Sequence, residues 1–235
     1  MQNENFTAII LSYKRPQNIE RICEIILTIP DVIQIIVANN NPSIDLNDFV
    51  KIKTPRLILI NQRKNFGCVK RYQIAHRQQS NYFLSIDDDL FLSKVQIEYL
   101  MQKLIEDSDR PHGFWGQNYK IDRGKIVFEH GIINKDTYVD IINRAYFYTK
   151  AHVAELFKLV RLTKTLINDV GPCDDIFLSF SGAKQPLIHH IREYEDCPTS
   201  NEQGIAFWLE PGFDSKREAI LQRVLEFKRF LDSPN

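Results

Sequence analysis

The chain has 235 residues, of which 43% are hydrophobic and 26% are charged, and this ordinary globular composition excludes a disordered chain or a low-complexity fibre. Thirty Lys and Arg residues balance thirty Asp and Glu residues, so the formal net charge is zero. Proteins that wrap long nucleic acid normally carry a basic excess, and we therefore expect no nucleic-acid partner.

The four cysteines lie far apart and form no Cys-x-x-Cys pair, which favours a reduced, cytoplasmic protein over a disulfide framework or a zinc ribbon. No apolar run approaches the roughly 20 residues that a membrane-spanning helix needs. The lysines and arginines of the C-terminal helix predict at most a peripheral contact with a membrane surface. The sequence leaves the oligomeric state open.

The first half of the chain alternates short apolar strands with helices. Residues 6–12 form a nearly continuous apolar run, which is typical of a strand buried on both faces of a parallel sheet. Pro16 then favours a helix start, and apolar residues recur at helical spacing until Pro30 ends that helix. The other elements predicted in this half are strands at 33–38, 57–60 and 82–86 and helices at 69–79 and 95–105. Because strands alternate with helices, we predict a doubly wound α/β sheet.

After about residue 110 the predicted elements become shorter and more mixed. They are strands at 114–119, 125–129 and 145–148 and helices at 152–159, 174–180 and 214–231. The last helix is amphipathic, and we expect it to pack on the domain. Its apolar stripe consists of Ile220, Val224, Phe227 and Leu231. No linker rich in Gly, Ser or Pro and no internal repeat divides the chain.

Three consecutive carboxylates, Asp87, Asp88 and Asp89, follow the predicted strand at 82–86 directly, and another apolar pair follows them. In open α/β sheets, ligands bind beyond the carboxyl ends of the strands. Adjacent carboxylates repel one another unless a cation or hydrogen-bond donors compensate, and Mg²⁺ and Mn²⁺ take carboxylate oxygens together with substrate phosphates. A solvated acidic turn is the alternative, but the apolar residues on both sides argue against it. The pattern predicts a site for a metal ion and a nucleotide.

Three other loops are expected at the same edge of the sheet. Tyr13 and Arg15 follow the first strand, where Tyr13 can stack on a base and Arg15 can reach a phosphate. Asn39 follows the second strand, although asparagine also suits an ordinary turn. Lys70 and Arg71 lie where a loop containing glycine runs into a helix, which suits either a bound anion or a solvated helix start.

A second pair of carboxylates, Asp174 and Asp175, stands at the start of a later helix, just after Pro172. Carboxylates at this position complement the helix dipole, and capping can be their whole role. They can equally present one acid to a bound substrate, as a general base or as a stabiliser of charge.

Three segments of the chain are also similar to short sequence motifs that occur together in one family of proteins. Ile86-Asp87-Asp88-Asp89 is similar to a strand end that reads Val-Asp-Asp-Asp, and Cys173-Asp174-Asp175-Ile176 is similar to a helix start that reads Cys-Asp-Asp-Ile. Arg144-Ala145-Tyr146-Phe147-Tyr148 is similar to a strand that reads Gly-Ala-x-Phe-(Tyr/Phe). With them, the chain resembles the GT-A fold glycosyltransferases over about residues 6–208. It most resembles the exostosin C-terminal type of family 64, and family 2 shares the front half.

The resemblance implies a single GT-A domain over residues 1–235, with a Rossmann-like nucleotide-binding half of about 1–110 and an acceptor-binding and catalytic half of about 111–235. It implies a metal-dependent transferase of the hexosyl or N-acetylhexosaminyl type. Such an enzyme moves a sugar from a nucleotide diphosphate sugar, with UDP the expected nucleotide, to a glycan or another hydroxyl acceptor.

The resemblance also implies roles for the residues of the nucleotide-binding half. Tyr13 and Arg15 would contact the nucleotide, and Asn39 would lie near the base. Arg71 would reach the ribose or a phosphate, and Lys70 beside it would add positive charge against the departing diphosphate.

Among the acids, the resemblance assigns the ribose and the sugar to Asp87 and Asp88. Asp89 would bind Mn²⁺ or Mg²⁺, which bridges the diphosphate and stabilises it as it leaves. Asp175 would lie beside the reacting carbon, with Asp174 next to it.

The chain departs from the family's pattern near its C-terminal end, where Leu209 and Glu210 replace a histidine, so the acceptor side stays open. The stereochemical outcome depends on whether Asp175 stabilises the sugar carbon, which predicts retention, or deprotonates the acceptor, which predicts inversion, and the resemblance favours retention. Two other functions also stay open. One is a catalytically inactive domain that binds a nucleotide sugar or a carbohydrate. The other is a sugar nucleotidylyltransferase, although the loop after the first strand lacks the glycines that such an enzyme uses to bind phosphate. A glycosidase fits less well, because its two acids face each other across a sugar.

Overall fold

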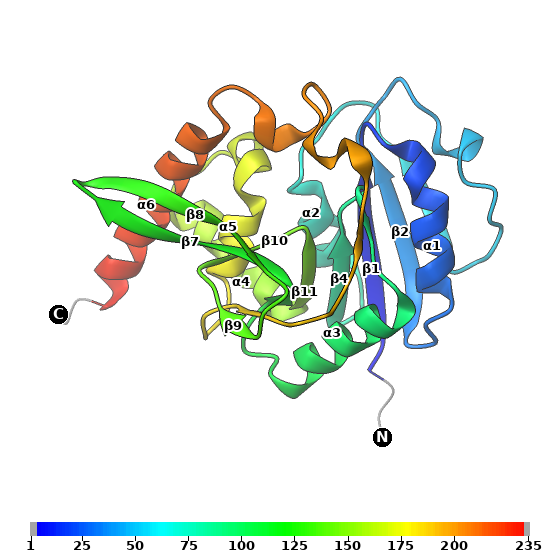
Figure 1. Cartoon of the computed structure of the whole chain (residues 1–235), viewed down its shortest axis with the longest axis horizontal. Helices are drawn as coiled ribbons and strands as arrows, with labels where there is room; N and C mark the ends of the chain where they lie inside the picture. Colours follow the sequence, from blue (N-terminus) through cyan, green and yellow to red (C-terminus); the bar gives the residue numbers. More distant parts are fainter. Residues whose placement is uncertain (1–3, 233–235) are drawn as a thin grey trace.

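The computed structural model describes the backbone of residues 4–232 and the side chains of residues 4–229, so the side chain of Leu231 lies outside the described part. Eight strands form the main sheet (Figure 1). In spatial order they are β3 (Leu57–Asn61), β2 (Val32–Asn39), β1 (Phe6–Ser12), β4 (Tyr82–Ile86), β11 (Ala145–Thr149), β6 (His112–Gly113), β12 (Leu187–Ile188) and β9 (Thr137–Tyr138). The first four are parallel, and β11 runs antiparallel to β4 and to β6.

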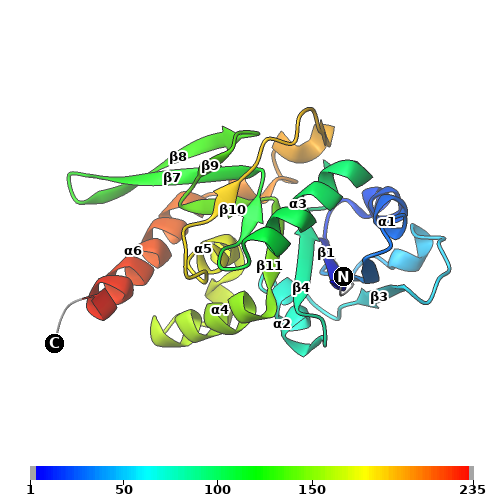
Figure 2. The same cartoon turned by 90° about the horizontal axis from the view of Figure 1, so that it is seen from below.

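Helices cover both faces of this sheet (Figure 2). On one face lie α1 (Ile19–Leu27) and α3 (Lys94–Glu106), and on the other lie α2 (Lys70–Arg77) and α4 (Lys150–Leu162). In β1, Ala8 and Ile10 pack with α1 and α3, whereas Ile9 packs with α2 and α4. Because both faces of β1 are buried, the strand is apolar nearly throughout, and this explains the run seen in the sequence.

The boundaries of β1 and β4 agree with the predicted strands at 6–12 and 82–86. The chain turns through a short 3₁₀ segment at Pro16–Asn18 before α1 begins at Ile19. Six strands of only two or three residues were not predicted. They are β5 (Leu90–Phe91), β6, β9, β10 (Ile141–Asn143), β12 and β13 (Glu195–Asp196). Runs of two or three residues carry too little periodicity to be recognised in a sequence.

The second half of the chain adds a hairpin and two more helices. β7 (Trp115–Asp122) and β8 (Lys125–Ile133) pair antiparallel, form a small sheet with β10, and extend away from the body of the molecule (Figure 1). α6 (Phe213–Asp232) packs against β8 and against α5 (Asp174–Ser179). Ile220, Leu221 and Val224 of α6 are buried, which confirms that this amphipathic helix packs on the domain.

The segment after β12, orange in Figure 1, returns to the carboxyl ends of β1 and β4. There β13 pairs with β5, and the backbone N–H of Cys197 donates to the carbonyl oxygen of Asp89 at 2.9 Å. Segments from both halves of the chain therefore meet at this edge of the sheet. No helix among the described residues is both long enough and apolar enough to cross a membrane.

Candidate functional site

Two aspartate runs that lie far apart in the sequence meet at one edge of the main sheet. Asp87–Asp89 follow β4, and Asp174 and Asp175 begin α5. Arg71, in the first turn of α2, joins the two runs: its Nη1 lies 3.0 Å from Asp87 Oδ1, and its Nε lies 3.3 Å from Asp174 Oδ2. Three elements thus converge at the edge where open α/β sheets bind their ligands.

Arg15 and Tyr13, in the loop after β1, lie against the first aspartate run. Arg15 Nη1 is 3.1 Å from Asp88 Oδ1, and its Nη2 is 3.3 Å from Asp89 Oδ2. The backbone N–H of Tyr13 donates to Asp88 Oδ2 at 3.1 Å, while its side chain is exposed. Arg15 also donates to the side chain and to the carbonyl of Thr199. The guanidinium group is therefore fixed between the aspartates and the segment after β13.

A second arginine, Arg144, binds the same run from the loop before β11, and it was not among the predicted site residues. Its Nη2 lies 3.0 Å from Asp89 Oδ1, and both of its Nη atoms donate to the carboxylate of Asp196. Its guanidinium carbon lies 4.6 Å from the centroid of the Trp115 ring. The sequence does carry a sign that this residue is unusual. Segment 144–148 begins with arginine, whereas the strand motif that this segment resembles begins with glycine.

Arg217 of α6 binds the second aspartate run, and it too was missed. Its Nη1 lies 2.7 Å from Asp175 Oδ1, and Asn143 donates to Asp175 Oδ2 at 2.6 Å. Arg217 is only 2% exposed and lies in line with Ile220 and Val224 on the apolar face of the helix. A charged residue within an apolar stripe needs a buried partner. The place of Arg217 in this stripe was therefore the feature of the sequence that could have identified it.

Burial shifts the pKa values of three of these carboxyl groups upward. It raises the pKa of Asp88 to about 6 against the opposing effect of Arg15, and that of Asp174 to about 7 against the opposing effect of Arg71. Burial also raises the pKa of Asp87. Carboxyl groups that titrate near neutral pH at such an edge are typical of sites that move protons or bind charged ligands.

Lys70 does not join the aspartates, although Arg71 beside it does. Its ammonium group lies 4.8 Å from the centroid of the Phe66 ring. Its side chain lines a hollow of about 320 Å³ with residues of β2, β3 and α2. Successive residues of a helix point about 100° apart, and this separates the two neighbouring cations.

Asn39 is buried at the end of β2 and holds the loop that follows. Its amide nitrogen donates to the carbonyl oxygens of Asn41 and Ile44 and to Asn61 Oδ1, and its Oδ1 accepts the backbone N–H of Asn41. These bonds engage the amide on both sides. The contact with a base that the resemblance implies would require some of them to break.

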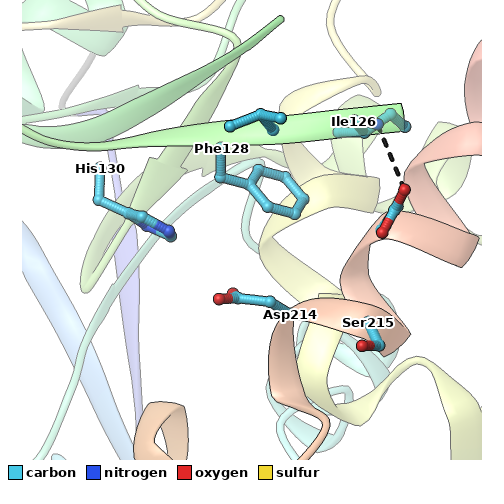
Figure 3. Close-up of a pocket in the computed structure, with 7 residues that line it drawn as sticks. Ile126, Phe128, His130, Asp214 and Ser215 are labelled. Carbon is cyan, nitrogen blue, oxygen red and sulfur yellow. Dashed lines mark hydrogen bonds between the residues drawn. The ribbon is translucent and has the colours of Figure 1, made fainter. Parts of the chain in front are cut away.

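A hollow of about 250 Å³ lies between the hairpin and α6 (Figure 3). Its lining comprises Ile126, Val127, Phe128, His130, Asp214, Ser215 and Glu218. Glu218 Oε1 accepts the backbone N–H of Ile126 at 3.2 Å, which ties α6 to β8. The guanidinium carbon of Arg217 lies 5.5 Å from the centroid of the Phe128 ring. Arg217 thus connects this hollow to the second aspartate run.

The surroundings of Asp89 do not fit the divalent cation that the resemblance implies. Carboxylate oxygens are suitable ligands for Mn²⁺ or Mg²⁺, but Arg144 and Arg15 each approach a different oxygen of Asp89. A cation on these oxygens would face two guanidinium groups of like charge. Within the described part of the chain, no group of three or more His, Cys, Asp or Glu residues is arranged to hold a metal ion.

Comparison with known proteins identifies the family. The model of the glycosyl transferase family 64 domain matches residues 6–230. The chain belongs to this family. Among curated proteins, the family 64 chain is similar to an exostosin-like-3 homologue of Caenorhabditis elegans, with 23% identity over 206 residues that cover 86% of the chain and 25% of the relative. The chain therefore spans about a quarter of the length of this relative.

Two solved structures share the fold at low sequence identity. CMP:2-keto-3-deoxy-manno-octonic acid synthetase complexed with CTP has a TM-score of 0.54 and 12% identity, over 83% of this chain and 94% of that one. The 2-C-methyl-D-erythritol 4-phosphate cytidylyltransferase of Francisella tularensis has a TM-score of 0.51 and 11% identity, over 79% and 89% of the two chains. The predicted α/β class, with a Rossmann-like front half and a mixed sheet, is confirmed.

Proposed function

We propose that this family 64 domain transfers a sugar from a nucleotide diphosphate sugar, with UDP the expected nucleotide, to a hydroxyl group of a glycan. The observation that carries the proposal is the junction of the two aspartate runs through Arg71 at the carboxyl edge of the sheet. One run faces the loops that are expected to bind the nucleotide, and the other contacts α6 through Arg217 and β10 through Asn143. Donor and acceptor can therefore meet between them.

On the donor side, the loop after β1 and the start of α2 supply the contacts. Tyr13 is 41% exposed, so its ring is accessible for stacking on a base. Arg15, Arg71 and Arg144 bring three guanidinium groups to this edge, and these groups suit the negative charge of a diphosphate. The side chain of Asp87 is 29% exposed, so its carboxylate can accept a hydrogen bond from a sugar or ribose hydroxyl.

On the catalytic side, Asp174 and Asp175 have different surroundings. Asp175 is fixed by Arg217 and Asn143, and from this position it can face the positive charge that develops on the sugar carbon. Burial raises the pKa of Asp174 to about 7, so this group can hold or release a proton near neutral pH. Asp174 Oδ2 is buried and faces Arg71 Nε at 3.3 Å.

We place the acceptor in the hollow between β8 and α6. Its carboxylates and His130 can bind sugar hydroxyls, and the ring of Phe128 offers an apolar face for a sugar ring. Arg217 lies between this hollow and Asp175. On this view about residues 1–110 bind most of the donor, to which the second half contributes Arg144, and about residues 111–235 bind the acceptor.

Thermal unfolding with UDP, GDP, CDP and ADP, in Mn²⁺ and in EDTA, tests the donor side. A nucleotide at about 100 times its dissociation constant adds about 2.7 kcal/mol to the free energy of unfolding, so the right one should raise Tm by about 5–10 °C. The nucleotide that shifts Tm is then supplied as its sugar conjugates with glycan acceptors, and the release of the nucleotide and the transfer of the sugar are measured together.

The variant Asp87→Asn should lose most of this shift, because the neutral amide no longer pairs with Arg71 or accepts from a hydroxyl as a carboxylate does. Asp122→Asn, an exposed position on the hairpin, is the matched control and should keep it. If no nucleotide shifts the wild-type Tm, a carbohydrate-binding domain becomes the better assignment. Release of pyrophosphate from CTP and a sugar would instead indicate a nucleotidylyltransferase.

A further inference from the structure

Arg144 has a backbone conformation that side chains seldom adopt. Its φ is +65°, in the left-handed region, although it is not a glycine. The strand motif that it resembles has glycine at this position, and glycine reaches such a φ without steric cost. Its carbonyl oxygen accepts the backbone N–H of Asp87 at 2.9 Å, so this conformation is part of how the first aspartate run is held. An arginine that keeps strained backbone at a ligand-binding edge suggests that its side chain has a use there.

The guanidinium group of Arg144 is fixed from several sides. Asp196 binds both of its Nη atoms, and Trp115 lies against its face, with 4.6 Å between the guanidinium carbon and the ring centroid. Ser200 Oγ accepts from Nη2 at 3.4 Å. The side chain is still 15% exposed, so a ligand at the sheet edge can reach it. Its position is therefore set before any ligand binds.

This fixed cation lies against the carboxylate that was expected to bind a metal. Arg144 Nη2 lies 3.0 Å from Asp89 Oδ1, and Arg15 Nη2 lies 3.3 Å from the other oxygen. We infer that Arg144 takes the place of the divalent cation, so that this domain binds the diphosphate of its donor without a metal ion. The inference rests on the proposed function, because it concerns how the donor's diphosphate is held.

The chemistry of a guanidinium group suits this role. Breaking the bond between the sugar carbon and the diphosphate oxygen leaves both electrons on that oxygen, and a fixed positive charge stabilises it there. A guanidinium group is planar, always charged and carries five N–H donors, so a phosphate can bond to those that Asp196 and Asp89 leave unused. Together with Arg15 and Arg71, Arg144 provides positive charge that a metal ion would otherwise supply.

The affinity of the full chain for UDP, measured by calorimetry in EDTA and in Mn²⁺, tests the inference. We expect the wild-type dissociation constants in the two conditions to agree within about twofold. Arg144→Gly restores the residue of the motif and removes the cation, so in EDTA it should bind UDP about tenfold or more weakly, and Mn²⁺ should recover most of that loss. Arg144→Lys keeps the charge without the planar fork and should fall between the two.

Arg123→Gly is the matched control, since Arg123 also has a positive φ, of +48°, and is exposed at the turn between β7 and β8. It should bind UDP as the wild type does in both conditions. The inference is overturned if wild-type binding is lost in EDTA and regained with Mn²⁺, a comparison that needs no variant. It is also overturned if folded Arg144→Gly binds UDP in EDTA as tightly as the wild type. If the wild type binds no nucleotide diphosphate in either condition, the proposed function has failed as well.

Discussion

The two aspartate runs of the site are built alike but lie in different environments. The first run is held by Arg15, Arg71 and Arg144, and the second by Arg71 and Arg217. In the run after β4, the side chains of Asp87, Asp88 and Asp89 are 29%, 11% and 15% exposed, whereas those of Asp174 and Asp175 at the start of α5 are 7% and 9% exposed. The first run can meet a ligand that arrives from solvent. The second holds charge and protons where water is largely excluded.

The largest expected effect separates chemistry from binding. Asp175→Asn keeps the shape of the side chain but removes its negative charge, so the rate of sugar transfer should fall by about a hundredfold or more. The affinity for UDP should stay within about twofold, because the donor's nucleotide is expected at the other run. Steady-state kinetics and calorimetry on the same preparation measure both quantities.

Asp169→Asn is the control for this variant, since Asp169 is exposed in the loop that precedes α5. It should leave both the rate and the affinity unchanged. A fall in UDP affinity as large as the fall in rate in Asp175→Asn would contradict the division of labour between the two runs. Unchanged transfer would remove Asp175 from the chemistry altogether.

The second prediction concerns the pH dependence of stability. Burial raises the pKa of Asp174 from its ordinary 3.8 to about 7. Between these values the folded state binds more protons at this group than the unfolded state does, so the free energy of unfolding falls as the pH rises. This loss should be on the order of 3 kcal/mol, and it should be largely absent in Asp174→Asn.

Urea unfolding at about pH 4 and about pH 7.5 measures how the free energy of unfolding of each protein changes with pH. The other titrating groups contribute nearly equally in wild type and variant, so the difference between the two proteins reports on Asp174. Asp174→Asn should gain stability relative to the wild type as the pH rises between the two values. An equal pH dependence in the two proteins would mean that Arg71 keeps the Asp174 carboxylate charged, and the contrast in environment between the runs would then be smaller than the burial suggests.

The sequence was sufficient for the longer strands and for the position of the aspartates along the chain, and insufficient for the shortest strands and for the partners of the aspartates. Strands β1 and β4 are buried on both faces, so their continuous apolar runs marked them within a residue. The run after β4 stood out because three carboxylates interrupt apolar sequence. Arg144 and Arg217 were missed because each meets its aspartate only through tertiary packing, from the loop before β11 and from α6.

Asn39 shows the opposite limit. The prediction that it lies at the end of a strand is confirmed, but an asparagine there suits a turn and a ligand contact equally well. The structure uses its amide to hold the loop at Asn41 and Ile44. Local sequence could place this residue, and only the hydrogen-bond partners could show how its amide is used.

The smallest expected effect comes from the other cation at the start of α2. The resemblance gives Lys70 and Arg71 a shared role, but Lys70 lines the hollow beside β2 and β3, where burial and the nearby Arg77 lower the pKa of its ammonium group. Lys70→Met should therefore change the affinity for UDP by less than about twofold, as expected of a charge outside the ion pairs of the site.

Lys64→Met is the matched control, because the ammonium group of Lys64 lies over the same Phe66 ring. A loss of about tenfold in Lys70→Met alone would mean that Lys70 turns toward the diphosphate when the donor binds. The positive charge at the first aspartate run would then come from Lys70 as well as from Arg15, Arg71 and Arg144.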